Sequence, residues 1–248
     1  MAINRRSNVV FDRWTDYRRA VNELITTGVY RRLVAIHSDA VVEPDGFQRA
    51  RHRMHGSMYG PVGYRRFLPW HRAYLIAFER ELRRIDDTLS LPYWDWDNDE
   101  GRLIGVRNFI GLSTGRNLGP GPGEPPDVQG RIWFSSRQQT EDMENFEGDY
   151  YPLTRFLEQN PHNAGHDWVG GDMANTRVSP NDPIFWMHHA QIDRIWSEWQ
   201  KVNAGEKAFL TGREKRLDPW GSEFDVDTID DIGNLGNDSY EYEPPLQP

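Results

Sequence analysis

The chain has 248 residues and a formal net charge of −9, and 37% of its residues are hydrophobic. This composition supports a substantial core, shows no apolar run near the ~20 residues of a membrane span, and offers no basic surface for nucleic acid, so we expect neither a membrane nor a nucleic-acid partner. Because the chain has no cysteine, disulfides, thiolate metal sites and a cysteine nucleophile are excluded.

The N-terminal segment bears on cellular targeting. Arg5 and Arg6 form a twin arginine, but the residues after them are charged where a secretion signal is apolar. A cytoplasmic location is therefore the simplest expectation, and secretion together with a partner is the alternative.

Two amphipathic helices are predicted next along the chain. Apolar residues recur at helical spacing through 12–27, and Gly28 ends this first helix. The periodicity resumes through 30–37, which places His37 on the buried face of the second helix. Glycines and prolines are frequent in 40–66, so this segment is predicted to be a loop.

The middle of the chain predicts one strong helix and two irregular segments. The helix runs from Pro69 to about Asp87 and carries His71 on its apolar stripe. The aromatic segment 91–96 is expected to pack against the helices. The Gly/Pro-rich stretch 111–130 predicts a surface loop.

The last third predicts two more helices. One spans 151–169, with Pro161 either breaking it or beginning it. The other follows Asp182, which is a good N-cap. Its inward stripe carries Phe185 and His189 together.

The C-terminal segment 217–248 holds nine acidic residues and no lysine or arginine, whereas the rest of the chain has 29 acidic and 29 basic residues. An acidic tail is usually a solvated segment. We expect one domain over 1–248, with this segment packing on it or trailing from it.

Histidines are the most informative residues of the chain. Six of the eight fall into two groups of three, which are His37, His55 and His71, then His162, His166 and His189. His162 and His166 are four residues apart, so both rings can project from one helix face toward one ion. A single such pair is more often coincidence, but six histidines placed in this way favour two metal ions held between helix pairs.

Three motifs carry a resemblance to a known family. They are FLPWHR at 67–72, HNAGH at 162–166 and DPIFWMHH at 182–189. These motifs closely resemble the signatures of type 3 copper proteins, and the chain is similar to the short bacterial tyrosinases and polyphenol oxidases within that class. The resemblance implies a mainly α fold, a four-helix bundle that houses a binuclear copper centre, with long irregular loops.

The resemblance also implies a ligand set. The first copper ion would bind His37, His55 and His71, and the second would bind His162, His166 and His189. Family members usually place the second ligand nine residues before the histidine of FLPWH, which is Val62 here, so the chain departs from the pattern. His52 competes with His55, and we favour His55 because HGS at 55–57 resembles that ligand segment in several relatives. His189 is preferred over His188, which we interpret either as a residue that supports the ligands from behind or as core packing.

The implied activity is ortho-hydroxylation of monophenols and oxidation of o-diphenols to o-quinones, with O2 as co-substrate. Glu158 and Asn163 match residues that hold an activating water in relatives. Phe185 would lie under the substrate, and Thr176 near the gate within the entrance loop 173–180. Phenols are the expected partners, and a copper-delivery protein is a further one to consider. The alternatives are an o-aminophenol oxidase, a catechol oxidase without monophenolase activity, and an oxygen carrier like hemocyanin.

Three of these side chains have simpler interpretations that the sequence leaves open. Glu158 would otherwise be a solvated helix residue, and Asn163 a local cap. Asp193, one turn after His189, either orients a ligand ring or pairs with a neighbouring arginine.

Overall fold

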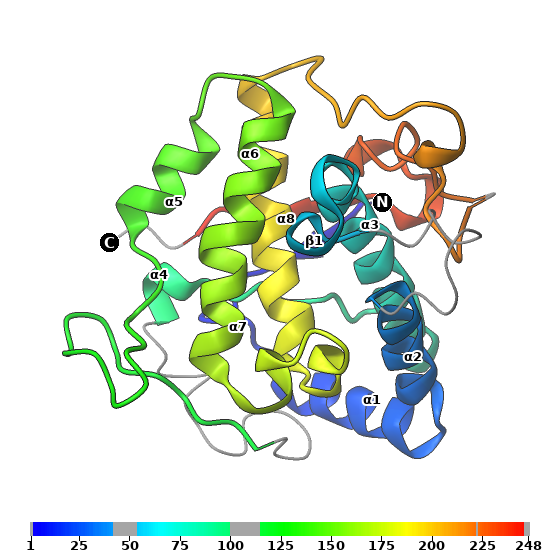
Figure 1. The fold of residues 1–248 in the computed structure, drawn as a ribbon. Coiled ribbons are helices and arrows are strands. Elements are labelled where there is room, and N and C mark those ends of the chain that lie inside the picture. Colours follow the sequence, from blue (N-terminus) through cyan, green and yellow to red (C-terminus); the bar gives the residue numbers. More distant parts are fainter. Residues whose placement is uncertain (1, 42–53, 100–114, 222, 246–248) are drawn as a thin grey trace.

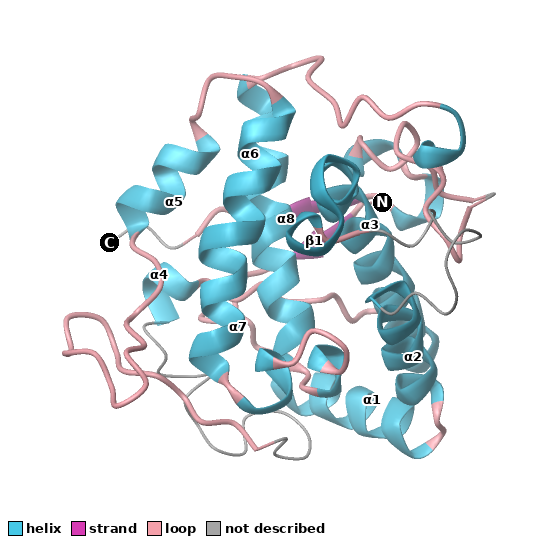
Figure 2. Cartoon of the chain, in the orientation of Figure 1, coloured by secondary structure: helices cyan, strands magenta, loops and turns pink. Residues whose placement is uncertain are grey.

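The computed structural model describes residues 2–41, 54–99, 115–221 and 223–245, and this part of the chain is mainly helical (Figures 1 and 2). Its α-helices are α1 (Trp14–Thr26), α2 (Val29–Val41), α3 (Gly56–Ile85), α4 (Trp96–Asp99), α5 (Arg137–Glu144), α6 (Tyr150–Leu157), α7 (Asn163–Val169) and α8 (Ile184–Val202). A π-helical turn, Glu158–His162, joins α6 to α7. Two short strands, β1 (Ile3–Arg5) and β2 (Tyr240–Tyr242), pair in parallel with Ile3 opposite Tyr240.

The central bundle consists of α2, α3, α8 and the continuous rod formed by α6, the π turn and α7. Figure 1 shows this rod running along α8, and the rod also contacts α3, which packs on α8 in turn. Helix α1 closes one end by packing on α2 and α3. The predicted four-helix bundle is therefore confirmed. None of the described helices is long and apolar enough to cross a membrane.

Helices α1 and α2 follow the predicted periodicity. In α1, four buried residues recur three or four positions apart, which are Tyr17, Ala20, Val21 and Leu24. Gly28 takes a φ of 75°, which a residue with a side chain rarely adopts, so α1 ends there and the chain turns directly into α2. The two helices pack on each other after a connection of only two residues, Thr27 and Gly28.

The prediction of a loop up to residue 66 and a helix start at Pro69 was wrong. Helix α3 begins at Gly56, continues after a kink at Gly60, and runs through Pro69. Pro69 has no N–H to donate to the carbonyl oxygen of Arg65. The hydroxyl of Tyr150 on α6 donates to that oxygen instead, at 3.0 Å. A contact from a distant helix thus satisfies the acceptor that proline leaves free, and the sequence around Pro69 contains no sign of it.

The predicted helix over 151–169 is confirmed, and Pro161 does interrupt it. The interruption takes the form of the π turn Glu158–His162, which widens the helix by one residue without ending it. Pro161 lies inside this turn. The turn carries both Glu158 and His162 on its buried side.

The acidic C-terminal segment packs on the body over its described residues. It buries five apolar side chains, which are Leu217, Phe224, Val226, Ile229 and Tyr240. Arginines of the body form ion pairs with its acidic side chains. For example, Arg80 on α3 pairs with Asp238 at 2.7 Å. The interpretation of this segment as a solvated tail therefore fails for 217–245, because its acidic residues alternate with apolar residues that reach the core.

The remaining elements follow the expectation in part. Trp94 and Trp96 of the aromatic segment are fully buried, as predicted. Residues 115–130 form no helix or strand, as predicted, whereas 111–114 lie outside the described residues. Asp182 caps α8 by accepting from the backbone N–H of Ile184 at 2.9 Å.

Candidate metal centre

Two compact histidine triads lie at the middle of the bundle. Within each triad the nitrogen atoms that could bind metal all lie within 4.8 Å of one another, and all six side chains are buried. The first triad comprises His37 of α2, His55 just before α3, and His71 of α3; the second comprises His162 of the π turn, His166 of α7 and His189 of α8. The structure thus brings together all six predicted residues.

The two triads face each other. The rings of His71 and His189 stack with their centroids 4.2 Å apart and their planes at 13°. The rings of His55 and His162 are 5.8 Å apart. Trp70 packs beside the first triad, with its ring 5.1 Å from that of His71. The spacing of the triads therefore fits a pair of ions that share one site.

Backbone carbonyl groups hold several of these rings in one orientation. The Nδ1 of His71 lies 2.7 Å from the carbonyl oxygen of Phe67, and the Nδ1 of His166 lies 2.8 Å from that of Met173. The Nδ1 of His162 is 3.2 Å from the carbonyl oxygen of Glu158. A proton on Nδ1 that donates to a carbonyl leaves the lone pair on Nε2 free for a metal.

The Nε2 atoms of the site fit this arrangement. Four Nε2 atoms have no hydrogen-bond partner among the described residues, which are those of His37, His55, His71 and His162. The Nε2 atoms of His166 and His189 point at each other, 3.2 Å apart. A buried polar atom without a partner costs about 1–3 kcal/mol, and metal coordination would offset that cost for each of these atoms.

Burial also sets the protonation state of the rings. It lowers the pKa well below the usual value for five of the six, and neighbouring imidazoles lower it further for His37, His71, His162, His166 and His189. These rings are therefore neutral at pH 7, which is the form that binds metal ions.

Glu158 holds the loop that carries His55. Its carboxylate is fully buried and accepts from the backbone N–H of Gly56 at 2.9 Å, and from the N–H and hydroxyl of Ser57 at 3.1 and 3.0 Å. The Nδ1 of His55 lies 3.5 Å from the same carboxylate. Burial raises the pKa of Glu158, but the contacts with His55, Gly56 and Ser57 outweigh burial and lower it. Glu158 is thus not a solvated helix residue.

His55 therefore occupies the position expected for the second ligand of the first triad. Its competitor, His52, lies outside the described residues. The anchoring contacts come from Gly56 and Ser57, the two residues of the HGS segment that follow His55.

We predict that Glu158→Gln weakens copper binding at the first triad by about 10- to 100-fold. An amide has one oxygen, so either Gly56 or Ser57 would lose its acceptor and face an NH2 group, and the His55 loop would shift. Copper titration followed by tryptophan fluorescence measures the affinity. The matched control is Gln159→Ala, which removes an exposed neighbour bonded to Tyr64 instead. Equal copper affinity of Glu158→Gln and the wild type would refute this role.

His188 packs behind the second triad, as predicted. Its Nε2 lies 3.0 Å from the carbonyl oxygen of His162. A Cβ atom on Gly165 would lie 2.4 Å from its Cε1, so the close approach of α7 and α8 requires glycine there. His188 therefore supports the π turn from behind the site.

Asp193 does not orient a ligand ring. Its carboxylate accepts from the Nε of Arg72 at 2.6 Å and from the hydroxyls of Tyr240 and Tyr242, both at 2.7 Å. The alternative interpretation, an ion pair with an arginine, is the correct one. The arginine comes from α3, however, so the contact joins two helices and the C-terminal segment instead of stabilising α8 alone.

A cavity of about 250 Å³ opens onto the two triads. It is lined by His37, His55, Ser57, His162, Asn163, His166, Asp167, Met173, Ala174, Thr176 and Ser179. Asn163 and Thr176 thus line this cavity and 173–180 contributes to its wall, whereas the roles assigned to these two residues stay predictions. Phe185 is buried against His37 and His189, at ring distances of 5.1 and 4.1 Å, and does not line the cavity, so its contact with a substrate stays a prediction.

Ser57 and Asp167 are the lining residues that the sequence interpretation missed. Ser57 is part of the HGS segment, and Asp167 directly follows the second histidine of HNAGH. Both positions are adjacent to recognised motifs, so examining the flanking residues of each motif would have found them.

Paired histidine triads at the centre of a helical bundle are the arrangement of a protein that could hold two metal ions, and comparison with known proteins gives the family. The family model for the common central domain of tyrosinase matches residues 27–126 and 127–202. The chain therefore belongs to the tyrosinase family. It is 32% identical to a tyrosinase of Streptomyces glaucescens, over 85% of this chain and 89% of that protein. It is 34% identical to a tyrosinase of Streptomyces antibioticus, over 73% of this chain and 76% of that protein.

Solved structures agree on the fold. A functional unit of octopus hemocyanin superposes with a TM-score of 0.68 at 21% identity, over 98% of this chain and 68% of that one. Latent apple tyrosinase superposes with a TM-score of 0.63 at 20% identity, over 99% of this chain and 64% of that one. Together with its family membership, the site makes the chain a copper oxidoreductase of the tyrosinase type.

Proposed function

We propose that the protein hydroxylates monophenols at the ortho position and oxidises o-diphenols to o-quinones, with O2 as the oxidant and two copper ions held by the histidine triads. The observation that carries this proposal is the pair of facing, buried triads beneath an open cavity. The tyrosinases among the curated relatives support it.

The donor set fits copper. Both triads consist of imidazole alone, a ligand that suits copper, zinc, iron and nickel, and family membership favours copper among these. When bound, a pair of copper ions supplies two electrons to O2. The chain contributes neutral rings in fixed orientations and a site enclosed by helices.

The cavity suits a single aromatic ring. Cavities of about 150 Å³ accept benzene in other proteins, so about 250 Å³ leaves room for a substituted phenol. Thr176 lies at its exposed side, so the ring can enter from solvent with its hydroxyl directed toward the histidines.

A monophenol must lose its proton before the ring is hydroxylated. We assign this step to a water held by Asn163, with Glu158 acting on it through Ser57. Asn163 lines the cavity, and its Oδ1 lies 3.0 Å from the Nδ1 of His162. Glu158 does not line the cavity but is linked to it by the hydroxyl of Ser57, which donates to Oε1 at 3.0 Å.

Steady-state assays with the copper-loaded protein separate this function from its alternatives. We expect oxygen uptake and quinone formation with both tyrosine and catechol. Turnover of catechol alone would indicate a catechol oxidase, and a marked preference for 2-aminophenol would indicate an o-aminophenol oxidase. Reversible O2 binding without any turnover would indicate an oxygen carrier and contradict the proposal.

A further inference from the structure

The cavity above the histidines has an uneven distribution of charge. Apart from the imidazoles, Asp167 is the one ionisable side chain among the described residues that line it. It follows His166 on α7 and is exposed to solvent. The other non-histidine lining residues are uncharged.

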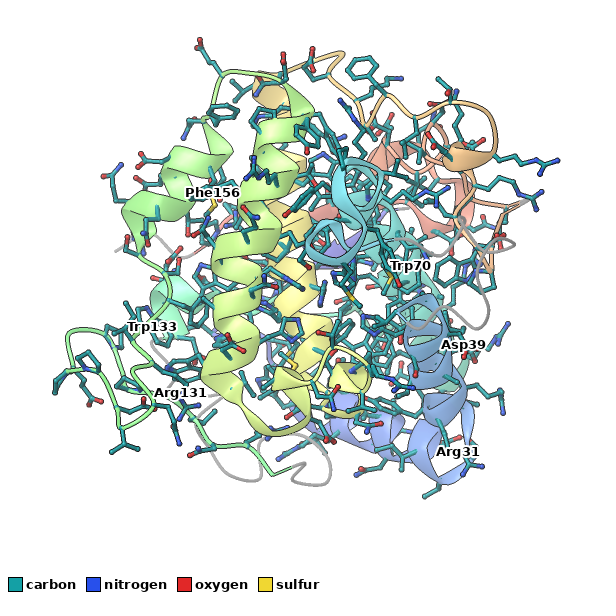
Figure 3. The ribbon with its side chains drawn as sticks, viewed as in Figure 1. Arg31, Asp39, Trp70, Arg131, Trp133 and Phe156 are labelled. Carbon is teal, nitrogen blue, oxygen red and sulfur yellow. The ribbon has the colours of Figure 1, made fainter. Side chains whose placement is uncertain are left out.

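The Asp167 carboxylate accepts no hydrogen bond and forms no ion pair within the described ranges. Its backbone carbonyl oxygen accepts from Arg131 at 3.1 Å, and the charge of Arg131 acts on the carboxylate as well. Arg131 pairs with Asp127 at 2.7 Å, lies on the loop before α5 (Figure 3) and does not line the cavity. A molecule in the cavity therefore meets the Asp167 carboxylate and not the guanidinium group of Arg131.

The proposed function would place the para substituent of a bound phenol near this charge. With the reacting hydroxyl directed toward the buried histidines, a substituent on the opposite side of the ring would extend toward the exposed residues Asp167 and Thr176. An ammonium group there would be attracted and a carboxylate repelled.

We propose that Asp167 makes the site selective for phenols and catechols with a cationic side chain over those with an anionic one. This inference rests on the proposed function and adds the class of substrate. Two unit charges about 5 Å apart in water change binding by about fourfold. We therefore expect kcat/KM to rise about fourfold for a cationic catechol, and to fall about as much for an anionic one, relative to a neutral catechol.

The test compares three catechols whose para side chains are cationic, neutral and anionic: dopamine, 4-methylcatechol and 3-(3,4-dihydroxyphenyl)propionate. In the wild type we expect kcat/KM to decrease in that order, and the differences to shrink in 1 M salt, where the Debye length is about 3 Å. Asp167→Asn is expected to bring the three values together, Asp167→Lys to reverse their order, and Asp167→Glu to keep the wild-type order.

Asp172→Asn is the matched control, because Asp172 lies five residues further along and does not line the cavity. It should keep the wild-type ratios. Equal ratios in the wild type and Asp167→Asn, at equal copper content, would overturn the inference. Failure of the wild type to oxidise any of the three would refute the proposed function instead, so the two failures are distinguishable.

Discussion

Replacing His189 with alanine is expected to reduce bound copper from about two ions per chain to about one and to abolish phenol oxidation. Two imidazoles remain in the second triad, and a site needs several convergent nitrogens to hold an ion tightly. The loss of one ion removes half of the electron supply, so turnover should fall below detection. Elemental analysis after copper loading and oxygen uptake with catechol measure the two effects.

The neighbouring histidine provides the control. His188→Asn removes an imidazole from the same helix, but His188 contacts the carbonyl oxygen of His162 and not the ions. This variant should still bind about two copper ions per chain at saturation. The assignment is wrong if His189→Ala retains full copper content, or if His188→Asn loses an ion as well.

Replacing Asp193 with alanine is expected to destabilise the protein by about 3–5 kcal/mol. Asp193 is the shared partner of Arg5 and Arg72, whose side chains are fully buried, and of the hydroxyls of Tyr240 and Tyr242. Arg5 keeps its ion pair with Glu79 at 2.9 Å, but Arg72 would lose its carboxylate partner. A buried charge without a counter-charge is costly, and urea unfolding measures the loss.

An exposed ion pair on the same helix is the control for this variant. Glu198 pairs with Lys201 one turn away at 2.7 Å, and the lysine is largely in solvent. Removing Glu198 should change the free energy of unfolding by less than about 1 kcal/mol. If Asp193→Ala were as mild as Glu198→Ala, the buried network would contribute little to joining α3, α8 and the C-terminal segment.

The sequence predicted the elements that depend on local periodicity. Helices α1 and α2 follow from the spacing of their apolar residues, and the ligand pair His162 and His166 from a spacing of four. His71, His162, His166 and His189 could be identified from the recognised motifs, His37 from helical periodicity, and His55 from the resemblance of its HGS segment. Local patterns of this kind need no knowledge of distant contacts.

Features that depend on contacts between distant segments could not be predicted in this way. Where α3 passes Pro69, the acceptor that this proline leaves free is satisfied by Tyr150, which lies more than eighty residues further along the chain. The parallel pairing of β1 with β2 joins the two ends of the described chain. The sequence indicated that Asp193 either pairs with an arginine or orients a ligand ring. That the arginine is Arg72 of α3 follows only from the three-dimensional structure.

The most direct test is a crystal structure of the copper-loaded protein with anomalous scattering recorded at the copper edge. We predict two peaks, one at about 2.0–2.1 Å from a nitrogen of each of His37, His55 and His71, the other at similar distances from His162, His166 and His189. One peak, or a first ion bound by His52 in place of His55, would contradict the site as described.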